Sequence, residues 1–183
     1  TFSLVLGDGF NGEVAVQDLG QRWLLTEGYL KLYPTARYVH SAIDALHDLQ
    51  AKAPRTIAID EVADMEVRAY RLAAYLSTQR PKDWFGARFS IPFALATLMV
   101  GERSGLDAFG DAAVNDPRIV NLASKIRVIE EPSFSAGYPA QQRVDLSLTT
   151  VGGACFHGQC TITSGEPDRP HSAESLQRKF NDM

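Results

Sequence analysis

Cysteine, excess basic charge and long apolar runs are all scarce in this sequence. Two cysteines among 183 residues are too few for a fold that is built on disulfides. Lys and Arg number 18 against 22 Asp and Glu, and the resulting net charge of −4 argues against nucleic acid as the main partner, because phosphate binding usually needs a basic face. No apolar run approaches the roughly 18 residues of a transmembrane helix, which excludes such a span.

The composition is that of a soluble globular protein, with 45% hydrophobic and 22% charged residues. The length suits one domain, with room for a terminal extension. The first residues, TFSLVLGDGF, lack the basic region of a signal peptide and carry no initiator Met. We therefore expect a processed chain or a piece of a longer one.

Apolar periodicity predicts a helix over residues 36–52, with Thr35 as its N-cap and Pro54 after its end. A second, nearly all-apolar run over residues 93–100 predicts a buried helix. Pro92 suits the first turn of that helix, Ser90 or Ile91 its cap and Gly101 its C-terminus. Further helices are expected over residues 66–78, 106–113, 117–123 and 172–180.

Alternating patterns predict strands over residues 56–62, 125–130, 143–149 and 155–163. Gly152 and Gly153 fall between the last two, which predicts an antiparallel hairpin. Mixed helices and strands with antiparallel pairing near the end indicate an α+β fold rather than a doubly wound sheet. The sequence has neither a glycine-rich phosphate loop after a strand nor a GxSxG nucleophile motif.

Three basic side chains flank the start of the first long helix. Lys31 lies before Pro34, and Arg37 and His40 follow it in the first helical turns. A helix N-terminus attracts anions, so these residues form a candidate carboxylate site. The alternative is a solvated first turn with ordinary surface cations.

Arg88 and Ser90 precede the apolar helix and form a weaker candidate anion site, the alternative being a helix cap and a surface arginine. His40, Asp44 and His47 share one helical face, but further metal ligands are missing, so no metal is expected. We instead expect His40 to face a pocket, Asp44 to orient or cap a group, and His47 to be exposed.

Cys155 and Cys160 flank His157 and Gly158 in CFHGQC. A hairpin turn at these two residues would bring the cysteines together as a disulfide or redox pair. The spacing is wrong for CxxC and no second pair could complete a zinc site, so two reduced cysteines are favoured.

Four segments, in order, resemble one family, MmgE/PrpD. Residues 31–45 (KLYPTARYVHSAIDA) resemble its K-x-Y-P-x(5)-H-x(3)-D-A segment, and residues 87–96 (ARFSIPFALA), with Gly101, resemble its A-x-F-S-x-P-Y/F-A-x-A segment. Residues 116–128 fit the helix and strand that follow, and residues 167–180 resemble its closing segment. The family includes 2-methylcitrate dehydratase, cis-aconitate decarboxylase and iminodisuccinate epimerase.

The resemblance implies the C-terminal portion of a two-domain enzyme. Residues 1–163 would be its smaller α+β, lid-like domain. Residues 164–183 would be a tail and helix that pack on an N-terminal helical domain absent from this chain. It further implies a cytoplasmic homodimer that needs no metal or organic cofactor.

The resemblance also implies lyase or epimerase chemistry on a small di- or tricarboxylate, through removal of a proton next to a carboxylate. Lys31 and His40 would be the catalytic residues, and Arg37, Arg88 and Ser90 would bind substrate. The decarboxylase subgroup carries His two residues after the motif's Pro, where this chain has Ala36, which argues against decarboxylation of cis-aconitate.

Two other functions remain open. The chain could be a non-catalytic domain that binds a carboxylate or a partner, or the whole protein could be an isomerase like iminodisuccinate epimerase. A redox or metal protein built on Cys155, His157 and Cys160 is much less favoured.

Overall fold

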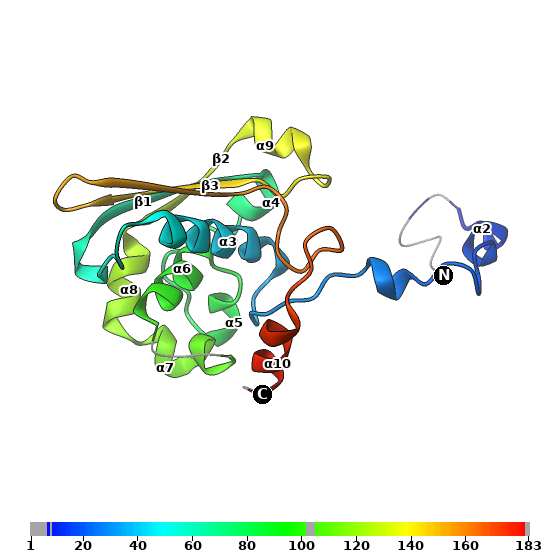
Figure 1. Cartoon of the computed structure of the whole chain (residues 1–183), viewed down its shortest axis with the longest axis horizontal. Coiled ribbons are helices and arrows are strands. Elements are labelled where there is room, and N and C mark those ends of the chain that lie inside the picture. The colour runs from blue at the N-terminus through cyan, green and yellow to red at the C-terminus, as the bar shows by residue number, and fades with distance from the viewer. Residues whose placement is uncertain (1–6, 8, 102–104, 182–183) are drawn as a thin grey trace.

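A four-stranded mixed sheet with most of the helices on one side forms the body of the molecule (Figure 1). The computed structural model describes residues 7, 9–101 and 105–181. The sheet order is β2-β1-β3-β4, in which β1 pairs parallel with β2 and antiparallel with β3, and β3 pairs antiparallel with β4. The α+β fold predicted from the sequence is confirmed. The strands are β1 (Val62–Ala69), β2 (Ile126–Glu130), β3 (Val144–Thr150) and β4 (Cys155–Cys160).

The described helices range from single turns to the sixteen residues of α3. The α-helices are α2 (Gly12–Val16), α3 (Arg37–Lys52), α4 (Arg71–Ala74), α5 (Trp84–Ala87), α6 (Ile91–Val100), α7 (Asp111–Val114), α8 (Pro117–Ser124), α9 (Pro132–Gly137) and α10 (Ala173–Asn181). Three 3₁₀ turns accompany them, η1 (Leu24–Glu27), η2 (Ile59–Glu61) and η3 (Asp107–Phe109).

Helix α3 corresponds to the helix that the periodicity of residues 36–52 predicts, and it lies directly against the sheet. Its apolar stripe is buried against β3 and β4. The approach to β4 is close at Gly158, where a Cβ atom would lie 2.1 Å from the Ala45 carbonyl oxygen. A side chain at that position would push the helix away from the strand.

The predicted cap of α3 is wrong. Ala36, not Thr35, is the N-cap, and the hydroxyl of the buried Thr35 has no hydrogen-bond partner. The Ala36 amide donates to the Arg88 carbonyl at 2.8 Å. This contact from the segment before α6 fixes the helix start one residue later than the local pattern indicates.

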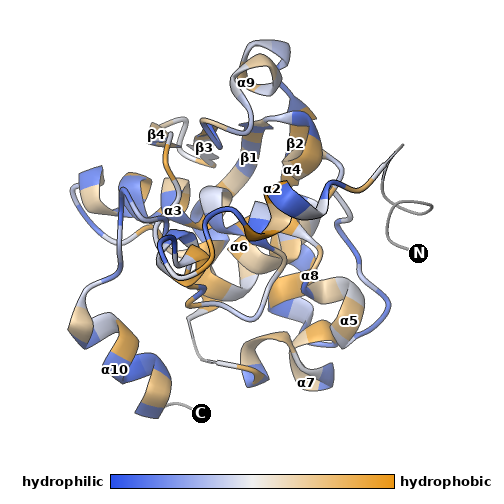
Figure 2. Ribbon diagram, turned by 90° about the vertical axis from the view of Figure 1, so that its right-hand side faces the viewer, coloured by the Kyte–Doolittle hydropathy of each residue, from blue (hydrophilic) through white to orange (hydrophobic). Residues whose placement is uncertain are grey.

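Helix α6 is the buried apolar helix that its sequence predicts. Ser90 caps it by accepting a hydrogen bond from the Phe93 amide at 3.0 Å, and Gly101 ends it with a φ of 71°. Figure 2 shows α6 as a largely hydrophobic ribbon inside the molecule. The segment 87–90, which joins α5 to α6, is thereby fixed beside the start of α3.

The predicted strand over residues 56–62 and the predicted helix over residues 66–78 are wrong. The strand β1 begins at Val62 and continues to Ala69, and the helix that follows it, α4, is a single turn. A shift in register between Val62 and Asp64 interrupts the alternation of inward side chains, which hides the strand. From Met65 onward the inward residues do alternate, and charged side chains on the open face of the sheet separate them.

The hairpin of β3 and β4 is confirmed, with its turn at residues 151–154. CFHGQC forms the whole of β4, so His157 and Gly158 are not a turn. Cys155 is exposed and Cys160 is buried, and both are free thiols. The five-residue separation points them to opposite faces of the strand, which excludes a disulfide between them.

Both described ends of the chain lie outside the core. Residues 9–31 contain no buried residue and most of them extend away from the body, and α10 lies along its lower edge in Figure 1. Between β4 and α10, residues 161–171 form a loop that we call the tail loop. None of the described helices combines the length and hydropathy needed to cross a membrane.

Candidate functional site

The start of α3 brings together several of the residues that the sequence predicts as a carboxylate site. Pro34 turns the chain into the helix, and the Arg88 carbonyl receives the Ala36 amide. Within the described part of the chain, the next two amides, of Arg37 and Tyr38, donate to no acceptor. These amides and the helix dipole make the N-terminus of α3 attractive to a negative group.

Lys31 lies at this helix start and is exposed. Its ammonium group donates a hydrogen bond to the Thr35 carbonyl at 3.2 Å. The contact holds a mobile four-carbon side chain across the entrance to α3 while leaving other N–H donors of the ammonium group available. Lys31 can therefore present a positive charge to an anion that approaches the helix.

His40 lies one turn into α3 and is 4% exposed. Its Nε2 atom is buried and has no hydrogen-bond partner. The ring of Tyr33 packs edge-on against it, with the two centroids 5.8 Å apart. A buried ring nitrogen without a partner is costly, so this atom is poised to bind a group that the chain itself does not supply.

The environment of His40 disfavours its protonated form. Burial is the largest cause and, with the positive charges of Arg37 and Lys31, lowers the pKa of His40 to about 3. A backbone hydrogen bond with Thr35 acts in the opposite direction but is outweighed. The ring is therefore neutral at physiological pH and can accept a proton or a hydrogen bond.

The Arg37 guanidinium is occupied by contacts within the chain. Its guanidinium donates to the Ser164 carbonyl at 3.1 Å and to the Glu166 carboxylate at 2.5 Å. It also lies over the Tyr29 ring, 4.4 Å from the centroid. Arg37 contributes positive potential to the site, but its hydrogen bonds join α3 to the tail loop.

Arg88 and Ser90 differ in whether they have a hydrogen-bond donor left for a ligand. The Arg88 guanidinium lies over the Trp84 ring at 4.6 Å, and its buried Nε has no hydrogen-bond partner. Ser90 is fully buried; its hydroxyl donates to the Thr78 carbonyl and accepts from the Phe93 amide. The helix-cap alternative thus describes Ser90, whereas Arg88 keeps an unused donor near the start of α3.

Sequence reasoning missed Thr35 as a polar group of the site. Its hydroxyl is one of the buried side-chain atoms without a partner, like His40 Nε2 and Arg88 Nε. A backbone hydrogen bond joins Thr35 to His40 at the entry to α3, and the Arg88 backbone reaches the same place because its carbonyl accepts from the Ala36 amide. Its position directly after Pro34 is the signal in the sequence, but that position predicts an N-cap.

The tail loop was also missed as part of this region. Asp44, predicted to orient or cap a group, accepts a hydrogen bond from the Ser164 amide at 2.6 Å. His47 is exposed, as predicted, and its ring Nε2 lies 3.4 Å from the Tyr33 hydroxyl. Among the described residues, no group of three or more His, Cys, Asp or Glu side chains is arranged to hold a metal ion.

Comparison with known proteins matches one family model. The model of the MmgE/PrpD C-terminal domain covers residues 33–183, which is most of the chain. The match includes every described element from α3 to α10, and therefore the whole sheet. A search of curated proteins returned no match.

Proposed function

Because the chain belongs to the MmgE/PrpD family, we propose that it is the C-terminal part of a cofactor-independent lyase or isomerase that acts on a small di- or tricarboxylate. The reaction begins with removal of a proton next to a carboxylate, as in 2-methylcitrate dehydratase. The observation that carries the proposal is His40, a buried neutral ring with an unpartnered Nε2 at a cationic helix start.

In this proposal, Lys31 pairs with one substrate carboxylate. Its ammonium group is exposed and held at the helix entrance by the Thr35 carbonyl. The amides at the start of α3 and the Arg88 guanidinium add donors for the same negative group. Arg37 acts through its charge, since its hydrogen bonds go to the tail loop.

His40 either binds the substrate or moves a proton. Its pKa of about 3 makes it a weak base while the site is empty. A bound carboxylate places negative charge beside the ring and offsets the charges of Arg37 and Lys31, which raises the pKa of His40 toward neutral pH. Substrate binding would thus strengthen His40 as a proton acceptor.

The remaining catalytic groups are expected on a helical domain that precedes this one in the full-length protein, and the family resemblance also suggests a homodimer. An epimerase reaction uses the same proton-removal step, so the residues of this domain do not distinguish it from dehydration. Ala36 argues against decarboxylation.

The test is proton NMR in D₂O on the full-length protein. The substrate panel is 2-methylcitrate, citrate, cis-aconitate, iminodisuccinate and tartrates, each followed for exchange of the α-proton or loss of substrate signal. We expect turnover or exchange on one compound and a loss of about 100-fold or more in Lys31→Ala, the usual effect of removing one charge-stabilising donor.

Lys52→Ala is the matched control, because Lys52 lies at the other end of α3 and pairs with Asp48 at 2.6 Å. Its rate should equal that of the unmodified protein. Binding of a carboxylate without exchange would favour the non-catalytic alternative. If no compound on the panel binds and none exchanges its α-proton, the proposal is overturned for these substrates.

A further inference from the structure

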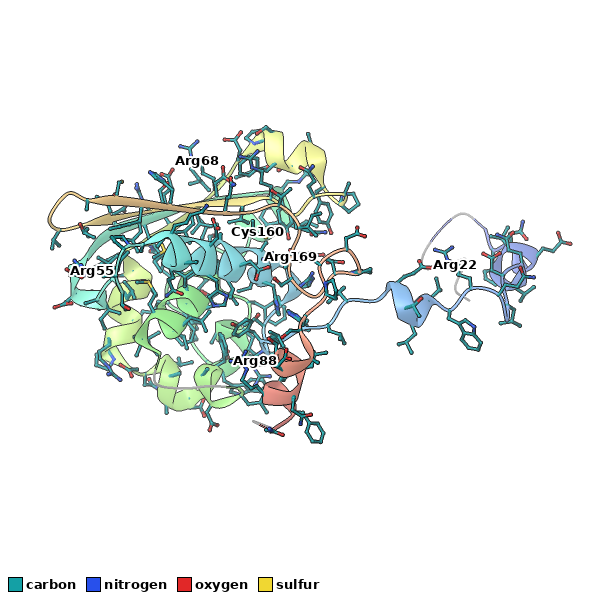
Figure 3. The ribbon with its side chains drawn as sticks, viewed as in Figure 1. Arg22, Arg55, Arg68, Arg88, Cys160 and Arg169 are labelled. Carbon is teal, nitrogen blue, oxygen red and sulfur yellow. The ribbon has the colours of Figure 1, made fainter. Side chains whose placement is uncertain are left out.

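The tail loop contacts two segments that lie far from it in the sequence. On one side it contacts α3, and on the other it contacts residues 29–31, which carry Lys31. His171 and Leu30 are 141 positions apart along the chain. Figure 3 shows Arg169 of the tail loop beside Cys160, next to α3.

Asp44 is the anchor of the loop on α3. Its Oδ2 atom accepts hydrogen bonds from the Ser164 amide at 2.6 Å and from the Arg169 guanidinium at 3.1 Å. The Cys160 thiol, whose pKa burial raises to about 12, lies 3.8 Å from the same oxygen and stays protonated as a donor. The Asp44 side chain is 11% exposed, so its bond from the Ser164 amide is only weakly screened by solvent, whereas the Arg169 side chain is half exposed.

Arg37 supports this anchor from the first turn of the helix. It donates to the Ser164 carbonyl and pairs with Glu166. Ser164 is therefore held through both its amide, by Asp44, and its carbonyl, by Arg37. Arg169 also donates to the Ile162 carbonyl at 2.8 Å, which closes the loop on itself. The loop therefore has a defined shape rather than a single point of attachment.

On its other side, the loop fixes the backbone of Leu30. The Leu30 amide donates to the Gly165 carbonyl at 3.0 Å, and His171 Nε2 donates to the Leu30 carbonyl at 3.1 Å. The fit is tight, because a Cβ atom at Gly165 would lie 2.1 Å from the Leu30 carbonyl oxygen. Lys179 of α10 donates to the carbonyl of the next residue, Lys31.

From these contacts we infer that Asp44 is a positioning residue for Lys31. Asp44 holds the tail loop on α3, and the loop holds Leu30 through both of its backbone groups. The position of Leu30 in turn sets the position of the Lys31 backbone, because the two residues are adjacent. The inference rests on the proposed function only where it concerns catalysis. The structural part, that Asp44 restrains residue 30 through the loop, is independent of any substrate.

Amide hydrogen exchange tests the structural part on this chain. In Asp44→Asn, which keeps the size of the side chain but removes its charge, we expect the Leu30 amide to exchange about tenfold faster or more. The sheet amides of β1 and β3 should keep their protection. Gly165→Ala should give the same pattern, since it displaces the Leu30 carbonyl without touching Asp44.

Asp64→Asn is the matched control, because Asp64 pairs with Arg127 at 3.2 Å on the open face of the sheet. It should leave exchange at Leu30 unchanged. Unchanged exchange at Leu30 in Asp44→Asn would overturn the inference, whatever Gly165→Ala does. Equal loss of protection at Leu30 and throughout the sheet would also overturn it, since Asp44 would then support the whole body.

A double-mutant cycle tests the catalytic part in the full-length protein. If Asp44 acts through Lys31, Asp44→Asn lowers kcat/KM in the unmodified protein but has no further effect in Lys31→Ala. Additive losses would overturn the link between the two residues. If no compound on the panel reacts, the proposed function fails, while the exchange experiment still decides whether the loop is positioned by Asp44.

Discussion

At the scale of single residues, His40 combines near-complete burial with a ring nitrogen that has no partner. Protonation would place a positive charge in this environment beside two other cations. The same features that suit the ring to a proton-accepting role therefore make the folded state sensitive to acid.

We predict that His40 destabilises the fold as the pH falls. Its folded pKa is about 3, below the ordinary value of 6.5, so between these values the unfolded chain binds more protons than the folded one. The free energy of unfolding should fall by about 2 kcal/mol from this residue alone between pH 6.5 and pH 5. Urea unfolding at several pH values measures the slope.

The slope should be smaller in His40→Gln, which cannot be protonated. His157→Gln, at an exposed position on β4, should keep the slope of the unmodified protein. Equal slopes in all three proteins would show that His40 is not held neutral in the fold.

Lys31, Arg37 and His40 could be predicted as a group because they are close in the sequence and flank one helix start. Asp44 and the tail loop could not be assigned to that region in the same way. The partners of Asp44 are Ser164 and Arg169, more than a hundred residues away, and short-range spacing carries no information on such contacts.

At the scale of secondary-structure elements, the contact between α3 and β4 depends on the absence of a side chain at Gly158. The Ala45 carbonyl and the Leu49 amide lie 2.1 Å and 2.6 Å from where a Cβ would be. Both are backbone atoms inside α3, so they cannot move without shifting the helix.

Gly158→Ala should therefore destabilise the protein by about 1–3 kcal/mol, the usual cost of overpacking a core. Urea unfolding should show a lower midpoint with an unchanged slope, because the surface exposed on unfolding stays the same. Gly152→Ala is the control, since its nearest atom, the Thr150 hydroxyl oxygen, lies 3.9 Å away. Equal midpoints for the two variants would contradict the tight contact.

Elements with their own start and stop signals could be predicted from the sequence. Helix α6 has Ser90 and Gly101 at its ends, and α8 begins at Pro117 after the capping residue Asp116. β1 could not be predicted, because a register shift interrupts its alternation and its order in the sheet is set by distant strands. The parallel pairing of β1 with β2 has no local signature at all.

At the scale of the whole molecule, the body contrasts with the segments at its periphery. Residues 9–31 have no buried side chain, although this stretch includes Trp23 and Leu25, exposed at 70% and 91%. Phe180 on α10 is also 71% exposed. We propose that another domain or a second copy covers these large apolar side chains.

Limited trypsin digestion of this chain should cleave first after Arg22. Arg22 is exposed and its side chain pairs with the nearby Glu27 at 2.5 Å, so the backbone at this position can readily enter the active site of a protease. Cleavage within α3 or the sheet should be much slower, and mass spectrometry identifies the sites.

Protection of Arg22 that increases with protein concentration would indicate that a second copy covers this segment, and sedimentation velocity would then detect a dimer. Cleavage of the body at the same rate as at Arg22 would contradict the contrast between core and periphery.

The bonds between Leu30 and the tail loop also constrain the order of assembly during synthesis. His171 and Leu30 are separated by 141 positions, so the loop that positions Lys31 emerges from the ribosome long after Lys31 itself. Closing so long a connection is entropically costly until the intervening sheet has formed. The region around Lys31 is therefore completed after the sheet, and a nascent chain that has not yet released His171 from the ribosome carries a folded sheet with an unformed site.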